Sequence, residues 1–240
     1  MGSGTVFERY EIKYIITEKQ KELIKNGMEK YMAPDKYGRS VIRNIYYDTA
    51  DSRLIRRSNE KPVYKEKLRV RSYRRVESDD EKVFVELKKK YNSVVYKRRT
   101  VLSENTAAKW LNDGQLPQEQ TQIISEIEYF RRFYGSLVPS AFVSYDREAF
   151  FAVDGSDFRI TFDENISVRT TDLSLKKDVG GEKLLGNGLV LMELKTHSGI
   201  PLWMTSLLSE NEIYKTSFSK YGTAYRTMIF PEKGEIKNVC

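Results

Sequence analysis

One segment of this sequence carries basic side chains at every second position, which constrains the fold more than any other feature. Residues 62–74 contain the evenly spaced cations Lys65, Lys67, Arg69 and Arg71. Side chains in a β-strand alternate between the two faces of a sheet, so these four cations share one face. The segment therefore predicts a strand with one densely positive face.

The same alternation recurs in other predicted strands. The three-residue pattern Glu-x-Lys occurs in three of them, as Glu11/Lys13, Glu86/Lys88 and Glu193/Lys195. Further same-face residues are Lys97 with Arg99, and Arg159 with Thr161 and Asp163. Apolar residues fill the alternate positions of the last strand, where Val190, Met192 and Leu194 lie opposite the charged pair.

Two interpretations of these charged rows remain open. An antiparallel sheet often has one solvated face, and each row by itself is consistent with such a face. Alternatively, the rows line an enclosed lumen. Packed like charges repel, and an enclosed ion without a partner costs several kcal/mol, so a lumen of this kind would have to be wet and hold a polyanion. Arginine and lysine side chains together would satisfy the oxygens of a phosphate chain.

The overall composition points to an anionic partner and narrows the chemistry. There are 41 Lys and Arg against 34 Asp and Glu, a net charge of +7 with a pI near 9.2. A basic domain suits phosphate, nucleotide, nucleic acid or an anionic membrane surface. The single cysteine, Cys240, excludes an intrachain disulfide, and the single histidine, His197, excludes a two-histidine metal motif. Aromatic residues alternate away from the basic face, so we expect no nucleic-acid binding.

The pattern of segments predicts an α+β fold built on antiparallel strands. Predicted strands cover residues 7–16, 41–48, 62–74, 82–90, 93–102, 141–152, 158–162 and 189–196, with a tight turn at 92–93. Predicted helices cover 17–33, 104–112, 117–134, 201–209 and 219–229. No repeat or linker divides the chain, so we expect one domain over 1–240 with a core of about 6–230. No stretch is long enough for a membrane span and no signal peptide is recognisable, so we expect a cytoplasmic location.

Nine stretches, in order along almost the whole chain, resemble the triphosphate tunnel fold in its vacuolar transporter chaperone (VTC) polyphosphate-polymerase branch. No single stretch is specific, but their ordered succession is. They are residues 9–14 (RYEIKY), 43–49 (RNIYYDT), 67–73 (KLRVRSY), 85–88 (VELK), 96–98 (YKR), 144–147 (SYDR), 159–163 (RITFD), 192–196 (MELKT) and 217–221 (SFSKY). The resemblance implies an antiparallel β-barrel, the tunnel, with flanking helices and a C-terminal helix near its mouth.

The resemblance also implies roles for individual residues. The residues that would contact phosphates are Lys13, Arg69, Arg71, Lys88, Lys97, Arg147 and Arg159, with Lys220 on the C-terminal helix. Glu193 would hold Mn²⁺ or Mg²⁺, or alternatively form an ion pair with a lysine of the lumen. Glu11 and Glu86 are further candidate ligands, although each of these two could instead orient the lysine two residues on. The family tends to have another lysine shortly before the one at 220, where this chain has Ser217, with Lys215 further back.

The implied activity is an ATP-dependent phosphoryl transfer that lengthens inorganic polyphosphate. Phosphoryl transfer depends on positioning and charge neutralisation rather than on a reactive side chain, which suits a chain so poor in histidine. The hydrolytic relatives open with Glu-x-Glu-x-Lys, whereas this chain has Arg9 at the first position. A metal-dependent triphosphatase and a non-catalytic polyphosphate or nucleotide binder remain alternatives. The identity of any membrane-associated partner protein stays open.

Overall fold

The computed structural model describes residues 10–92 and 94–231 of the chain. Arg9, Ser93 of the predicted turn and Cys240 lie outside these ranges. Within them, one antiparallel sheet contains β1 (Tyr10–Thr17), β2 (Met32–Pro34), β3 (Ser40–Thr49), β4 (Tyr64–Ser72), β5 (Lys82–Tyr91), β6 (Val94–Ser103), β7 (Leu137–Ala152), β8 (Arg159–Arg169), β9 (Glu182–Lys183), β10 (Leu189–Thr196) and β11 (Lys215–Thr216). The helices are α1 (Glu18–Met28), α2 (Arg53–Asn59), α3 (Glu104–Asp113), α4 (Gln122–Tyr134), α5 (Leu202–Glu210), α6 (Lys220–Ala224) and the π-helix η1 (Tyr225–Ile229).

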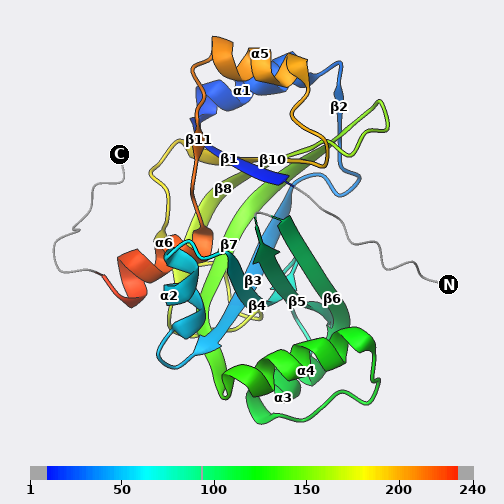
Figure 1. Cartoon of the computed structure of the whole chain (residues 1–240), viewed down its shortest axis with the longest axis vertical. Helices are drawn as coiled ribbons and strands as arrows, with labels where there is room; N and C mark the ends of the chain where they lie inside the picture. The colour runs from blue at the N-terminus through cyan, green and yellow to red at the C-terminus, as the bar shows by residue number, and fades with distance from the viewer. Residues whose placement is uncertain (1–9, 93, 232–240) are drawn as a thin grey trace.

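The sheet is strongly curled, as the predicted α+β fold with a barrel-like sheet requires. Its strands follow the order β11-β1-β10-β8-β7-β3-β4-β5-β6, with β2 beside β7 and β9 beside β8. Figure 1 shows β1 and β10 in the upper part of the molecule, facing β4, β5 and β6 below. Among the described strands, β6 does not pair with β1 or β11, so hydrogen bonds do not close the barrel. We call the part of the sheet with β1 and β10 the upper half and the part with β4, β5 and β6 the lower half. An ion pair between Lys88 of β5 and Glu11 of β1, at 2.7 Å, joins the two halves instead.

The outer face of the lower half is apolar and packs against two helices. Leu68 of β4 and Leu87 of β5 are fully buried there, at the positions that alternate with the charged row. Trp110 of α3 and Ile127 of α4 belong to the same buried cluster. The alternation predicted from the sequence is therefore confirmed: the apolar side chains of these strands pack against α3 and α4, and the charged ones occupy the alternate positions on the opposite face. Figure 1 shows α3 and α4 below these strands.

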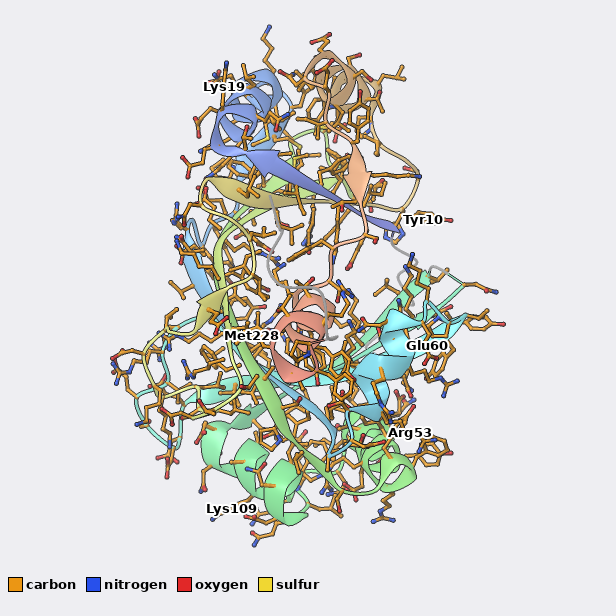
Figure 2. All side chains as sticks on the ribbon, turned by 90° about the vertical axis from the view of Figure 1, so that its left-hand side faces the viewer. Tyr10, Lys19, Arg53, Glu60, Lys109 and Met228 are labelled. Carbon is orange, nitrogen blue, oxygen red and sulfur yellow. The ribbon has the colours of Figure 1, made fainter. Side chains whose placement is uncertain are left out.

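The upper half is built in the same way. Met192 of β10 and Phe162 of β8 are buried together with Ile24 of α1 and Met204 of α5. A third cluster lies on the other face of the sheet, where Tyr221 of α6 packs with residues of β3 and β7. Figure 2 shows this C-terminal helical segment, marked by Met228, lying across the middle of the sheet.

Several element boundaries differ from the prediction for identifiable reasons. The first helix ends at Met28 rather than near residue 33, because Met32–Pro34 pair with β7 as a short strand. Helix α2 was not predicted. Its N-terminus is satisfied by the buried carboxylate of Asp48, which accepts hydrogen bonds from the backbone N–H groups of Leu54 and Ile55 at 2.8 and 3.0 Å. Among the described helices, none combines the length and apolar composition needed to cross a bilayer.

Candidate functional site

One face of the curled sheet gathers the charged rows, and we call it the interior face. Strand register aligns the rows: Arg69 of β4 lies between Tyr46 of β3 and Glu86 of β5. The charged members of the interior face are Glu11, Lys13, Lys65, Lys67, Arg69, Arg71, Glu86, Lys88, Lys90, Lys97, Arg99, Arg147, Arg159, Asp163, Glu193 and Lys195, joined by Lys220 of α6.

A single carboxylate organises the lower half of the interior face. Glu86 is only 1% exposed and is surrounded by four cations. Its oxygens lie 2.7 Å from Arg69 Nη2, 2.8 Å from Lys97 Nζ, 3.6 Å from Arg99 Nε and 3.9 Å from Arg71 Nε. Burial alone would raise the pKa of Glu86, but these neighbours hold it well below its usual range. Glu86 is therefore a fixed negative charge that orients arginines and a lysine of neighbouring strands, not Lys88 two residues on.

The pKa of Lys97 indicates an excess of positive charge around Glu86. Burial, the largest influence, lowers the pKa of Lys97 to about 8 even though Glu86 attracts its proton. The neighbouring Arg71 and Arg69 push it in the same direction as burial. The cluster thus carries more positive charge than its carboxylate can balance.

The upper half of the interior face centres on Glu193, which is 7% exposed. Four cations surround it: Lys195 at 3.2 Å, Lys220 at 3.4 Å, Arg147 at 3.5 Å and Lys13 at 3.6 Å. Burial favours the neutral acid, yet these cations hold the pKa of Glu193 well below its usual range. Glu193 is therefore ionised, and four cations compete for its two carboxylate oxygens.

Asp163, beside Glu193, is a second carboxylate of this half. It is fully buried and accepts two hydrogen bonds from Arg147, both at 2.6 Å, and one from Lys220 at 2.5 Å. This fork geometry fixes the guanidinium plane. Arg147 therefore has one rigid partner in Asp163 and a longer contact to Glu193.

The start of the C-terminal helix crosses the interior face. Lys13 of β1 donates to the carbonyl of Phe218 at 2.9 Å, and Lys67 of β4 donates to the hydroxyl of Ser219 at 3.0 Å. The Ser219 side chain also caps α6. With Lys220 bound to β8 and β10, three consecutive residues connect both halves of the sheet. The C-terminal helix therefore covers the interior face at this point, as the resemblance implied.

Lys67 is the most exceptional cation of the interior face. No described carboxylate lies within ion-pair distance of Lys67 Nζ, which donates a hydrogen bond to the hydroxyl of Ser219. Burial is the main reason that the pKa of Lys67 lies well below the ordinary lysine value. Repulsion by the nearby cations lowers the pKa further; these are Lys13, Lys88, Lys65 and Arg69. Keeping such a buried lysine charged is costly unless an anion lies beside it, and no described carboxylate does so.

Tyr145 of β7 lies between the two halves. Its hydroxyl accepts a hydrogen bond from Arg71 at 3.2 Å, while its ring faces Arg147 and Lys220 at 5.0 and 4.4 Å from the centroid. Burial alone would raise the pKa of Tyr145, but the three cations lower it to about 8. The tyrosine thus contacts phosphate-binding candidates from β4, β7 and α6.

The structure brings most of the residues predicted for the site together. Lys13, Arg69, Arg71, Lys88, Lys97, Arg147, Glu193 and Lys220 all meet on the interior face. Arg159 shares this face but is exposed at its end, opposite Lys195 in the register. Glu11 pairs across the sheet with Lys88, rather than with Lys13. Lys215 lies on β11, away from these pairs.

Sequence reasoning did not assign Lys67, Arg99, Tyr145, Asp163 or Lys195 to the site. The signal was available for four of them, because Lys67, Arg99, Asp163 and Lys195 follow the same two-residue alternation as their assigned neighbours. Tyr145 also lies two residues before Arg147, within the stretch 144–147, but as an uncharged residue it does not belong to a charged row. Its role depends on three cations from distant strands.

The described residues contain no group of three or more carboxylate, histidine or cysteine side chains that could hold a metal ion. Mg²⁺ and Mn²⁺ often take one or two carboxylates and complete their shell with phosphate oxygens and water. Glu193 offers one such carboxylate, and the cations around it can turn to the same phosphates. The donor set therefore fits a divalent cation that arrives with a phosphate chain.

The comparisons agree with this geometry. The family model described as "VTC domain" matches residues 8–229. A comparison with curated proteins gives no match. Among solved structures, the fold is similar to a putative adenylyl cyclase from Hippeastrum described as having a dominant triphosphatase activity, with a TM-score of 0.55, 17% identity and coverage of 92% of this chain and 95% of that one. It is also similar to a putative adenylate cyclase from Bacillus halodurans, with a TM-score of 0.53, 12% identity and coverage of 89% and 96%.

Proposed function

Because the chain belongs to the VTC domain family, we propose that it is an ATP-dependent polyphosphate polymerase. It would transfer the γ-phosphate of ATP to the end of a growing inorganic polyphosphate chain on the interior face. Membership of a triphosphate-tunnel family makes nucleoside triphosphates and polyphosphate the ligand classes to consider. The similar fold of the Hippeastrum protein, which is described as having a dominant triphosphatase activity, supports the same ligand chemistry.

The observation that carries the proposal is the uncompensated positive charge of the interior face. Glu86 and Glu193 are each surrounded by four cations, and Lys67 has no described carboxylate within ion-pair distance and several cations near it. Buried cations without enough carboxylates are costly unless a bound anion balances them. A phosphate chain supplies repeated anionic oxygens, which arginine forks and lysine ammonium groups bind through strong charge-assisted hydrogen bonds.

We assign phosphate binding to residues from both halves of the sheet. They are Lys13, Arg69, Arg71, Lys88, Lys97, Arg147, Arg159 and Lys220, together with Lys67, which the structure adds. Glu86 and Asp163 would hold the arginines in position. Upon binding, the lysines around Glu193 would turn from that carboxylate to the phosphates.

The reaction itself needs no strong base. An oxygen of the terminal phosphate of the chain forms a bond to the γ-phosphorus of ATP. The bond from that phosphorus to the bridging oxygen breaks, and ADP leaves with the electron pair. Because the attacking oxygen is already anionic, the interior face has only to align the two phosphates and neutralise their charge. Glu193 would hold Mn²⁺ or Mg²⁺, which when bound neutralises charge on the phosphate oxygens.

The proposal is tested by incubating the protein with ATP and Mn²⁺ or Mg²⁺ and separating the products by gel electrophoresis. We expect polyphosphate of increasing length, with one ADP formed for each phosphate added. Release of free phosphate without polymer would replace the polymerase by a triphosphatase, for which the neighbour from Hippeastrum is the precedent. Tight binding of polyphosphate without any turnover would identify a binding domain.

Removing Arg71 should weaken triphosphate binding. Arg71 is 6% exposed, and its guanidinium donates hydrogen bonds to Asn44 at 2.9 Å and Tyr145 at 3.2 Å, so it is held in place before the ligand arrives. Losing one charge-assisted contact costs about 1.5–3 kcal/mol, so Arg71→Ala should raise the triphosphate Kd about 10- to 150-fold. Calorimetric titration measures this, with Arg74→Ala, a highly exposed arginine just beyond β4, as the control. Equal affinities of the two variants would remove Arg71 from the phosphate site.

Triphosphate binding should weaken as the pH rises through about 8. Lys97 and Tyr145 both have a pKa of about 8, so Lys97 loses its positive charge and Tyr145 gains a negative one over the same range. Both changes oppose an anion, and a single group of this pKa makes Kd at pH 9 about 10-fold higher than at pH 7. Lys97→Arg keeps its charge, so the pH dependence of Kd should become shallower and retain only the contribution of Tyr145. A profile that is flat in the wild type between pH 7 and 9 would contradict these assignments.

A further inference from the structure

The interior face changes character at one end. The inward-facing positions of β4, β5 and β6 carry Lys and Arg along most of their length. Beyond Arg71 and Glu86 the same row positions are taken by Tyr73, Phe84 and Val101. Phe84 pairs with Arg71 on one side and with Val101 on the other. A row of charge therefore ends in an aromatic and aliphatic surface, which we call the aromatic end.

The rings of the aromatic end are arranged around one guanidinium. Tyr73 meets Phe84 edge to face, with ring centroids 5.4 Å apart. The guanidinium carbon of Arg99 lies 3.5 Å from the centroid of Phe84 and 5.7 Å from that of Tyr73. Tyr73 is 40% exposed and Val101 is 48% exposed, so the surface is open to a ligand. Aromatic rings and arginine planes are the groups on which nucleic-acid bases stack.

The aromatic end adjoins the phosphate-binding candidates directly. Tyr73 follows Arg71 by two residues, about 6.6 Å along an extended chain. The guanidinium carbon of Arg71 lies 5.9 Å from the Tyr73 ring centroid. Arg99 belongs to both regions, because its Nε also lies 3.6 Å from Glu86. If a ligand binds with its phosphates at Arg71, the group attached to those phosphates therefore lies beside Tyr73.

The opposite end of these strands offers no such surface. Among the described residues there, Lys65 and Lys90 face inward and are paired in the register, and Val95 of β6 is paired with Lys90 without any aromatic side chain in this row. Exposed tyrosines such as Tyr91 lie on the alternate positions, which point to the other face. The two ends of the interior face thus differ in kind: one suits an aromatic ring, and the other suits more phosphate.

We propose that the aromatic end, formed by Tyr73, Phe84, Arg99 and Val101, binds the base of the nucleoside triphosphate. The inference rests on the proposed function and adds an orientation to it. With the base on Tyr73 and Arg99, the triphosphate runs along the strands from Arg71 toward Lys67. The γ-phosphate then lies farthest from the aromatic end, and the growing chain extends toward Lys65 and Lys90.

The test compares two ligands that differ only in the nucleoside. Dissociation constants for ATP and for inorganic triphosphate are measured by calorimetry, without divalent metal, on wild type and on Tyr73→Ala. Loss of a stacking platform should raise the Kd for ATP about 5- to 100-fold, whereas the Kd for inorganic triphosphate should stay within twofold. Tyr73→Phe keeps the ring and should bind ATP like the wild type.

Tyr91→Ala is the matched control, because Tyr91 is an exposed tyrosine (51%) at the far end of β5. It should change neither dissociation constant. Thermal unfolding of each variant checks that the fold is retained, which the exposure of Tyr73 favours. An ATP affinity unaffected by Tyr73→Ala, or an equal loss for ATP and inorganic triphosphate, would overturn the base site while leaving the proposed function intact. A wild-type protein that binds neither ligand would overturn both.

Discussion

Replacing Glu193 by glutamine should nearly abolish polyphosphate synthesis while leaving polyphosphate binding in place. The substitution keeps the shape of the side chain and removes the carboxylate assigned to Mn²⁺ or Mg²⁺. Metal-ion neutralisation of the transferring phosphoryl group contributes several kcal/mol to the transition state, so turnover should fall about 100-fold or more. Binding should persist or tighten, because Lys13, Lys195, Lys220 and Arg147 lose a competing anion.

The measurement is polymer formed per unit time across a Mn²⁺ titration, with polyphosphate affinity determined separately. A loss confined to turnover separates a transition-state role from uniform binding, which would raise KM alone. Glu126→Gln is the matched control, because Glu126 also forms an ion pair, with Arg98 at 2.9 Å. Arg98 lies between the inward-facing Lys97 and Arg99 and therefore points to the outer face of the sheet. Full polymer synthesis by Glu193→Gln would remove Glu193 from the metal site.

Replacing Glu86 by glutamine should destabilise the free protein strongly, and triphosphate should reverse much of the loss. Glu86 is the buried anion shared by Arg69, Arg71, Lys97 and Arg99. Removing one partner of a buried ionic cluster typically costs about 3–5 kcal/mol, because the remaining charges stay buried and repel. A bound triphosphate restores negative charge and stabilises the folded state by mass action.

Urea denaturation with and without inorganic triphosphate measures both effects. We expect triphosphate to stabilise Glu86→Gln more than it stabilises the wild type. Glu128→Gln is the comparison, because Glu128 of α4 also binds two arginines, at 2.7 and 3.0 Å, outside the interior face. If triphosphate stabilised both variants equally, the cations around Glu86 would be a structural network without a role in phosphate binding.

The side of the sheet on which each charge lies could be predicted from the sequence. Successive side chains of a strand alternate by local geometry alone, so the row Lys67, Arg69 and Arg71 had to share one face wherever β4 came to lie. The same argument placed Glu193 opposite the apolar residues of β10. The ordered resemblance added the C-terminal helix, where Lys220 meets Glu193. Local periodicity thus determined the charged face and most of the residues on it.

The partner of each charge was decided only by the tertiary structure. Glu11 pairs with Lys88 of β5 and not with its own neighbour Lys13, and Glu86 binds Arg69 and Lys97 of adjacent strands. These contacts join residues far apart in the sequence, so they depend on strand order, register and the curl of the sheet. The backbone alternation sets a direction for each side chain but no distance across the sheet. The sequence by itself therefore determined which residues share a face. Only the curled sheet decided that this face is the interior one, where the cations exceed the described carboxylates that pair with them.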